Sequence, residues 1–359
     1  MIEKGRISAM QAAILLYPTI MATAVLLVPS ITGKIARQDM WLSPIWGSVF
    51  GIIAVILAAK LNNRFPKQTI IQYSSELVGK VTGKLIGFLY LFFLIHSLGI
   101  ILREYGEFIK GFFLLQTPIA VIIGSMVLVS ALAVRGGIEV MARSAQVFVP
   151  IVFVLFILIV ILLMPEMDPG NLFPILENGP MRSLEGAIVP ASWFQQFFLL
   201  SFMLPFMNDR EKGAKWGMVS VIAVMFTLVI SNLVAMFLFG NITSHFTYPV
   251  MEAARYISLA EFIQHMESVV MAIWVGGTFV KISVFYYVFV ISLSHWLHLS
   301  DYRPTVLPSG VILTVLGIWV VDNLPHLNEF LSTVYPFYGT LFYGIIPVIL
   351  LVVAMMRRS

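Results

Sequence analysis

The 359-residue chain contains no cysteine and few charged side chains. The absence of cysteine excludes disulfide bonds and thiolate metal sites. Asp, Glu, Lys and Arg make up 11% of the sequence, which is less than half of their usual share of about 25% in soluble domains. Hydrophobic residues make up 59%, and the mean hydropathy is +0.95. This composition excludes a soluble globular protein and predicts an all-α integral membrane protein.

Long apolar runs recur along the chain, and each is close to the roughly 20 residues that a helix needs to cross a bilayer. We predict ten transmembrane helices. They are Ser8–Pro29, Leu42–Ala59, Leu85–Leu102, Phe112–Val134, Val147–Met164, Leu184–Phe206, Trp216–Phe239, Ser268–Leu297, Val306–Val321 and Leu331–Met355. The first run is too long for a cleavable signal peptide and lacks a small-residue cleavage pattern, so we expect it to remain as a span.

The basic residues outside the spans predict the orientation, because Lys and Arg accumulate in cytoplasmic loops. With the N-terminus inside, fifteen of the 22 Lys and Arg residues fall in inner segments and six fall in outer segments. Both termini are therefore predicted to be cytoplasmic. The net charge of +4 is concentrated in the inner loops and favours contact with anionic lipid rather than with nucleic acid.

The ten spans divide into five and five about the loop Met164–Ser183. An odd number of spans in each half makes the second half enter the membrane from the opposite side. We therefore predict one transmembrane domain, residues 1–359, built as a five-plus-five inverted repeat with halves 1–164 and 184–356. This prediction rests on topology, since the two halves show no convincing residue-level identity.

The first span of each half contains a proline well inside its apolar run, Pro18 in one and Pro190 in the other. Proline removes a backbone donor and frees carbonyl groups, so broken helices one and six would provide a ligand site near the bilayer midplane. The alternative is that both prolines only kink their helices. Their corresponding positions favour the site, and the polar residues beside them are its candidate ligands. These ligand-binding candidates are Thr19, Thr23, Ser192 and Gln196.

Lys281 lies near the middle of the eighth span, about twelve apolar residues from either end. Its stem is too short to reach either interface from that depth, so the ammonium needs partners inside the protein. Helical spacing places it on one stripe with Thr278, a further ligand-binding candidate, and with Gly277. Lys281 is predicted to act in proton or ion coupling, or to take the place of a coupling sodium ion. The alternative is a structural ion pair or a clasp of carbonyl groups.

A second polar face follows the third span, where Ser97 and Glu104 recur at helical spacing. Ser97 is a candidate for ligand binding. Glu104, at the predicted outer end, is a candidate for proton or ion coupling, either by receiving a ligand amine or by lining a water path. The alternative for Glu104 is a solvated ion pair with the neighbouring Arg103.

The remaining features are architectural. The stretch Tyr248–Gln264 has an amphipathic pattern that is compatible with an outer surface helix or with a plain loop. Aromatic residues near span ends are typical of interfacial belts, and they include Trp41, Trp216 and Tyr335. No nucleophile, metal cluster or phosphate-binding loop supports an enzyme, and we expect neither a cofactor nor a metal.

Three stretches resemble the spore germination permeases, a family within the amino acid, polyamine and organocation transporter superfamily. Ala133–Val140 and the following Ala142-Arg143 are similar to the loop between that family's fourth and fifth spans. Asn171–Gly179 is similar to its outer loop before the sixth span, and Phe279–Tyr287 to its eighth span. The resemblance implies the superfamily's inverted-repeat fold with broken first and sixth helices.

The same resemblance implies a function: the B-type subunit of a nutrient germinant receptor in the inner membrane of a dormant spore. Such a subunit would bind a small nutrient, with an amino acid as the favoured class. It would work with an A-type membrane subunit and a C-type lipoprotein. Two other interpretations stay open, a proton-coupled amino acid transporter and a scaffold subunit whose pocket is vestigial.

Overall fold

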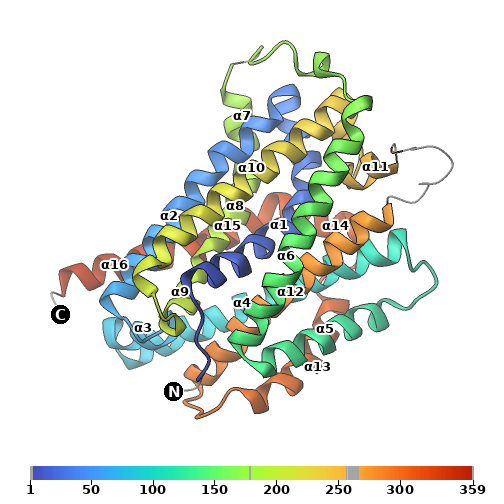
Figure 1. The fold of residues 1–359 in the computed structure, drawn as a ribbon. Coiled ribbons are helices and arrows are strands. Elements are labelled where there is room, and N and C mark those ends of the chain that lie inside the picture. The colour runs from blue at the N-terminus through green and yellow to red at the C-terminus, as the bar shows by residue number, and fades with distance from the viewer. Residues whose placement is uncertain (1–2, 178, 256, 258–266, 358–359) are drawn as a thin grey trace.

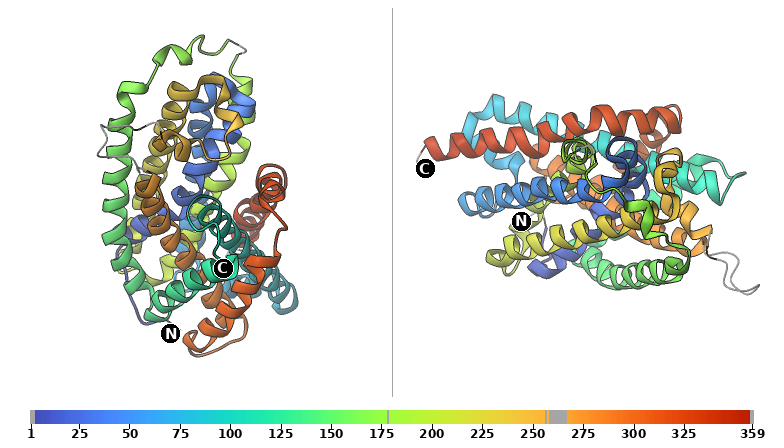
Figure 2. Two further views of the ribbon diagram at one scale, coloured as in Figure 1. Left: turned by 90° about the vertical axis from the view of Figure 1, so that its right-hand side faces the viewer. Right: turned by 90° about the horizontal axis from the view of Figure 1, so that it is seen from above.

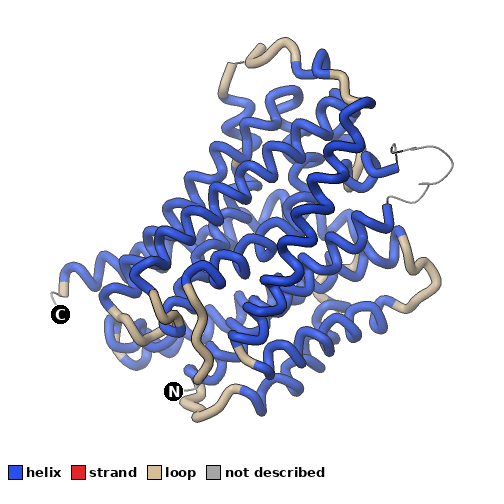
Figure 3. Tube along the Cα trace, in the orientation of Figure 1, coloured by secondary structure: helices blue, strands red, loops and turns tan. Residues whose placement is uncertain are grey.

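The computed structural model describes residues 3–177, 179–255, 257 and 267–357. In this part of the chain the regular structure is helical, apart from an isolated bridge between Ile7 and Met207 (Figure 3). The sixteen α-helices are α1 (Ala9–Ala36), α2 (Ser43–Arg64), α3 (Ile70–Val78), α4 (Lys80–Phe112), α5 (Ile119–Gly136), α6 (Ile138–Leu163), α7 (Met181–Gly186), α8 (Ile188–Gln195), α9 (Leu200–Met203), α10 (Gly213–Phe239), α11 (Pro249–Arg255), α12 (Glu267–Trp296), α13 (Arg303–Trp319), α14 (Leu324–Glu329), α15 (Tyr335–Thr340) and α16 (Ile346–Met356).

Every predicted span overlaps a helix or a chain of short helices, but the fourth, Phe112–Val134, was placed too early, because α5 begins at Ile119. Eight helical stretches are long and apolar enough to cross a membrane, which confirms a multi-pass membrane protein. One of them, Ala9–Arg64, contains both α1 and α2. Arg303–Trp319 is a shorter apolar helix, so a count of ten crossings stays a prediction.

Three segments form the centre of the bundle: α1, the chain of short helices Met181–Phe206, and α12. α1 packs against both α10 and α12, α2 packs against α8, and α12 also contacts α4 and α6 (Figures 1 and 2). In the most apolar window of Met181–Phe206, 94% of the residues are buried, against 17% in the window of Ile138–Glu166. The sixth span therefore lies inside the protein, whereas most of α6 is left to face lipid.

The predicted break of the first helix is wrong, because α1 continues through Pro18 as a single helix. The hydroxyl of Thr19 donates to the carbonyl of Leu15 at 2.7 Å. The carbonyl that lacks its backbone donor because of Pro18 is that of Ile14, one residue earlier. The Thr19 hydroxyl thus has its partner within its own helix.

The sixth span is interrupted as predicted, and in two places. The first is Ala187, between α7 and α8, and Pro190 follows it as the third residue of α8, where the proline has no N–H group to donate back to Gly186. The second is the 3₁₀ turn Gln196–Leu199. Gln196 therefore begins the second irregular segment.

Both ends of the chain lie at the same end of the helical bundle (Figure 1). The segments that join α2 to α3, α9 to α10, and α12 to α13 lie at that end too. Of the amphipathic stretch Tyr248–Gln264, α11 covers Pro249–Arg255, and residues 256 and 258–264 are outside the described part of the chain.

Candidate functional site

Lys281 lies in the middle of α12 and is 1% exposed. Its ammonium donates to the hydroxyl oxygen of Thr23 at 2.8 Å and to the side-chain oxygen of Gln196 at 3.3 Å. Thr23 belongs to α1, and Gln196 begins the 3₁₀ turn of the sixth span. A buried charge requires such hydrogen bonds, since an apolar environment cannot replace the water that it has lost. The lysine thus joins the three central segments of the bundle.

Thr23 accepts a second hydrogen bond from the indole Nε1 of Trp193 at 2.8 Å. Trp193 lies on α8 and is 2% exposed. Our sequence analysis missed this residue. The available signal was its position, three residues before Gln196, which places both side chains on the same side of a helix.

Gln196 donates from its amide nitrogen to the hydroxyl of Tyr335 at 3.4 Å. We had predicted Tyr335 to lie in an interfacial belt, and this is wrong, since it is 4% exposed. The segment Phe330–Val334 directly before it is a π-helical turn, and Pro336 follows it. A proline inside the last apolar run was the signal for irregular backbone, which is frequent at functional sites.

Two candidates are separated from this cluster by their hydrogen bonds. The Thr19 hydroxyl donates to Leu15, and the Ser192 hydroxyl donates to the carbonyl of Val189 at 2.7 Å. Both acceptors belong to the same helix as the donor. The structure therefore gives these two side chains a role in supporting their own helices.

Three other candidates are buried. The hydroxyl of Thr278 on α12 and one carboxyl oxygen of Glu104 on α4 have no hydrogen-bond partner among the described residues. Ser97 on α4 interacts with the hydroxyl of Tyr335, and so lies beside the Lys281 cluster. Glu104 is 2% exposed and interacts electrostatically with Lys281. An unpaired polar atom in such a place is costly, and it is an open position for a ligand or a water molecule.

Glu104 does not pair with Arg103. The Arg103 guanidinium instead forms an ion pair with Glu107 at 2.8 Å and donates to the carbonyls of Ile318 and Asp322 at 2.6 and 2.8 Å. The alternative of a solvated Arg103–Glu104 pair is therefore wrong. The Glu104 carboxylate is buried in the protein, and it interacts electrostatically with the Lys281 ammonium.

A small apolar cavity of about 50 Å³ lies between α1, α6, α10 and α12. Its lining includes Met21, Ala22, Trp274 and Gly277, and Ala22 precedes Thr23 in the sequence. Gly277 is one helical turn from Lys281, on the same side of α12. Small-molecule pockets usually measure at least about 300 Å³, so this cavity is smaller than an ordinary small-molecule site.

The arrangement offers complementary groups to a small zwitterion. The Lys281 ammonium suits a carboxylate, the Glu104 carboxylate suits an amine, and the neighbouring cavity suits an apolar side chain. These charges come from different helices and lie in a region of low dielectric, where each is strongly felt.

The comparisons by sequence with known proteins point to one family. A family model described as spore germination protein matches residues 6–323. Spore germination protein KB of Bacillus subtilis (strain 168) is 26% identical over 366 aligned positions, which cover 99% of this chain and 96% of that protein. Spore germination protein YndE of the same organism is 24% identical and covers 99% of this chain and 98% of its own length.

Among solved structures, the fold is similar to that of a Na⁺-coupled sialic acid symporter in a substrate-bound outward-open state. The TM-score is 0.68 at 12% identity, over 95% of this chain and 78% of that one. MhsT in complex with L-phenylalanine gives a TM-score of 0.61 at 16% identity, over 96% and 97% of the two chains. These similarities confirm the fold of inverted-repeat transporters. With this fold and the match over residues 6–323, the chain belongs to the spore germination protein family.

Proposed function

We propose that this protein is the B-type subunit of a nutrient germinant receptor, and that it binds an amino acid between α1, the sixth span and α12. Its place would be the spore inner membrane, with both termini cytoplasmic. The family membership and the transporter-like fold support this assignment. The orientation is supported by the excess of Lys and Arg in the predicted inner segments.

One observation carries the ligand proposal: the buried Lys281 ammonium is held by neutral oxygens. Its hydrogen-bond acceptors are the Thr23 hydroxyl and the Gln196 amide oxygen, and among the described residues it forms no ion pair. A neutral acceptor compensates a buried cation less well than a carboxylate does. A ligand carboxylate would therefore gain strongly by replacing one of these oxygens.

The rest of the ligand follows from the geometry. Its amine would approach the unpaired oxygen of Glu104, and its side chain would enter the cavity beside Trp274 and Gly277. Because that cavity is small, binding requires α1 and α12 to move apart. A ligand can drive this change only if it binds the open arrangement more tightly than the closed one.

Signalling would require partners. We propose an A-type membrane subunit and a C-type lipoprotein, to which this subunit passes its conformational change. Coexpression with both candidates and purification through a tag on this chain tests the assembly. Recovery of this chain alone in a mild detergent, with the partners present in the same membranes, would contradict it.

The nutrient site is tested by the melting temperature of the purified protein with a panel of amino acids, sugars and nucleosides. We expect one class of amino acid to raise the melting temperature of the wild type and of Lys110→Met, which removes an exposed lysine at the end of α4. Lys281→Met should lose the shift. A shift that Lys281→Met retains would place the ligand elsewhere, and a shift with sugars alone would reject the amino acid.

A second function is supported by the neighbours, which are transporters, and by the buried Glu104. A proton-coupled amino acid transporter would use the same site. Uptake of labelled amino acid into proteoliposomes separates the two functions. Uptake that a protonophore abolishes would favour transport, whereas ligand binding without uptake would favour a receptor.

A further inference from the structure

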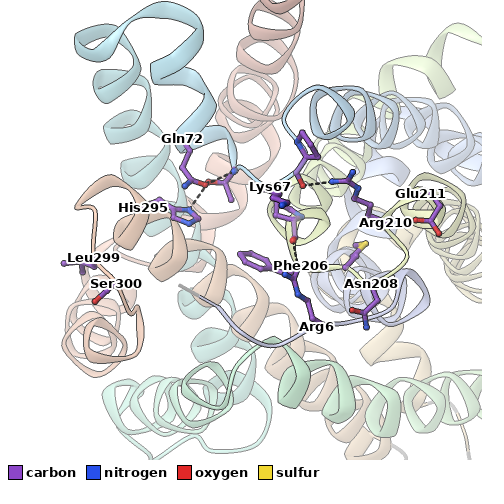
Figure 4. A pocket seen from close by; sticks show the side chains of 14 residues that line it. Arg6, Lys67, Gln72, Phe206, Asn208, Arg210, Glu211, His295, Leu299 and Ser300 are labelled. Carbon is purple, nitrogen blue, oxygen red and sulfur yellow. Dashed lines mark hydrogen bonds between the residues drawn. The ribbon is translucent and has the colours of Figure 1, made fainter. Parts of the chain in front are cut away.

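A second cavity lies away from Lys281, at the end of the bundle that carries both chain termini. It measures about 730 Å³, within the usual range of small-molecule pockets. Four segments surround it: the residues before α1, the α2–α3 connection, the segment between α9 and α10, and the end of α12 (Figure 4). The positive-inside rule predicts this end to be cytoplasmic.

The lining is basic. Arg6, Lys67 and Arg210 contribute three positive side chains from three different segments, and Glu211 is the one acidic residue among the described lining residues. Lys67 is exposed and forms no hydrogen bond or ion pair with the described residues. Arg210 donates from one nitrogen to the carbonyl of Pro66 at 2.9 Å, and its guanidinium has further N–H donors. A cavity with this lining attracts anions.

Uncharged hydrogen-bond donors also line the cavity. Thr69 is the N-cap of α3, and its hydroxyl lies 3.0 Å from Nδ1 of His295 at the end of α12. Gln72 accepts from the Thr69 amide with its side-chain oxygen, and its NH₂ group provides further donors at the cavity wall. The positive end of the α3 dipole lies at the same wall. Charged and neutral donors thus converge on one space.

We propose that this cavity binds a small anion of the phosphate or polycarboxylate class. The anion would bridge Arg6, Lys67 and Arg210, and so tie together three segments that are distant in the sequence. Four protein segments surround the site, which favours a soluble anion over a lipid headgroup with the same chemistry. None of the lining residues belongs to the Lys281 cluster, so this proposal does not depend on the proposed nutrient site.

The site adjoins the contacts that close this end of the bundle. The Arg6 guanidinium donates to the carbonyl of Pro205 at 2.8 Å, and the Arg6 amide donates to Glu139 at 2.8 Å. Next to it, the Ile7 amide donates to the carbonyl of Phe206 at 3.1 Å. The segment before α1 therefore links the start of α6 to the end of the sixth span.

Glu3 anchors the same segment on the other side. It is 1% exposed and accepts from the hydroxyl of Tyr302 at 3.1 Å. Burial and the Glu3 carboxylate raise the pKa of Tyr302 above its ordinary value, so the phenol stays protonated and donates. An anion that holds Arg6 in place would stabilise this whole set of contacts, by the mass action of a ligand that binds one state.

The test is calorimetric titration of the purified protein with pyrophosphate and with citrate, at an ionic strength matched with chloride. We expect one site per chain. Lys67→Gln with Arg210→Gln should weaken binding at least about tenfold, because it removes two charge-assisted contacts. The control is Lys212→Gln with Lys215→Gln, an equal change of charge at exposed positions near the cavity, and it should change affinity less than about twofold.

A second variant guards against misfolding. Lys67→Glu alters a side chain without described contacts, so it should keep the melting temperature of the ligand-free protein and still weaken binding. Limited trypsin digestion gives an independent readout, since pyrophosphate should slow cleavage after Lys4 and Arg6 in the wild type and not in Lys67→Glu.

Each outcome decides the proposal. Binding of phosphatidic acid in nanodiscs, with the same loss in the Lys67 and Arg210 variants and no binding of soluble anions, would keep the anion chemistry and assign it to a lipid. If the pocket variant and the control variant weaken anion binding equally, the affinity depends on general surface charge, and the proposed site is wrong. Absence of binding in all arms, or binding of a polyglutamate peptide alone, would also overturn it.

Discussion

The basic side chains at the middle of the bundle and at one of its ends differ in their exposure to solvent. At the middle, a single ammonium, Lys281, is buried and held at 2.8 and 3.3 Å by two neutral side chains. At the end, Arg6, Lys67 and Arg210 surround a cavity of about 730 Å³, and Lys67 and Arg210 are exposed. The middle of the bundle therefore has one charge that is shielded from water, and the end has several charges that water screens, arranged around a large cavity.

The difference follows from the dielectric environment. A charge pair at 4 Å is worth about 1 kcal/mol in water and about 4 kcal/mol at an effective dielectric constant of 20. One buried cation is therefore enough to recognise a carboxylate, whereas an exposed site needs several charges to reach comparable selectivity. The two sites should accordingly respond differently to mutation and to salt.

The largest effect is expected at the buried cation. Lys281→Met should weaken amino acid binding at least about 30-fold, since removing one member of a buried charged interaction costs roughly 2 to 5 kcal/mol. The same variant should bind pyrophosphate with unchanged affinity. Titration with both ligands checks this, and a parallel loss at both sites would show that they are not separate.

A smaller loss is expected at Thr23, whose hydroxyl accepts from both Lys281 and Trp193. Thr23→Val leaves two buried donors without their partner, and each such donor costs about 1 to 3 kcal/mol. We expect about tenfold weaker amino acid binding and a lower melting temperature. Thr23→Ser keeps the oxygen and should behave like the wild type, and equal damage in both variants would show that the shape of the side chain, and not the hydroxyl oxygen, sets the affinity.

Salt should separate the two sites without any mutation. The Debye length falls from about 10 Å at 0.1 M salt to about 3 Å at 1 M, and exposed charges are screened much more than buried ones. Between these concentrations pyrophosphate affinity should fall at least about fivefold, and amino acid affinity less than about twofold. A strong salt dependence of amino acid binding would indicate that Lys281 is solvated in the state that binds the ligand.

The smallest effect is expected where the structure assigns a hydroxyl to its own helix. Thr19→Val and Ser192→Ala should each change amino acid affinity less than about twofold, because both hydroxyls donate to carbonyls within one turn. Their effect should fall on the stability of α1 and α8 instead, as a slightly lower melting temperature. A large loss of affinity with unchanged stability would indicate that both side chains contact the ligand.

Sequence reasoning located much of the centre of the protein. The depth of Lys281 in an apolar run demanded internal partners, and two of the polar residues expected beside the prolines, Thr23 and Gln196, lie within hydrogen-bonding distance of it. It misjudged one of the two breaks. Pro18 was expected to break its helix and does not, whereas Pro190 follows an interruption at Ala187, between α7 and α8.

Composition and apolar run length alone determined that this chain is a multi-pass helical membrane protein, because hydrocarbon tolerates few charges and needs spans of a fixed length. Only the tertiary structure decided that Trp193 and Tyr335 reach the Lys281 cluster, and that Arg6, Lys67 and Arg210 share one cavity. The physical reason is that hydropathy and helical spacing describe one segment at a time. These groups meet because segments distant in the sequence pack together, and no local pattern records that contact.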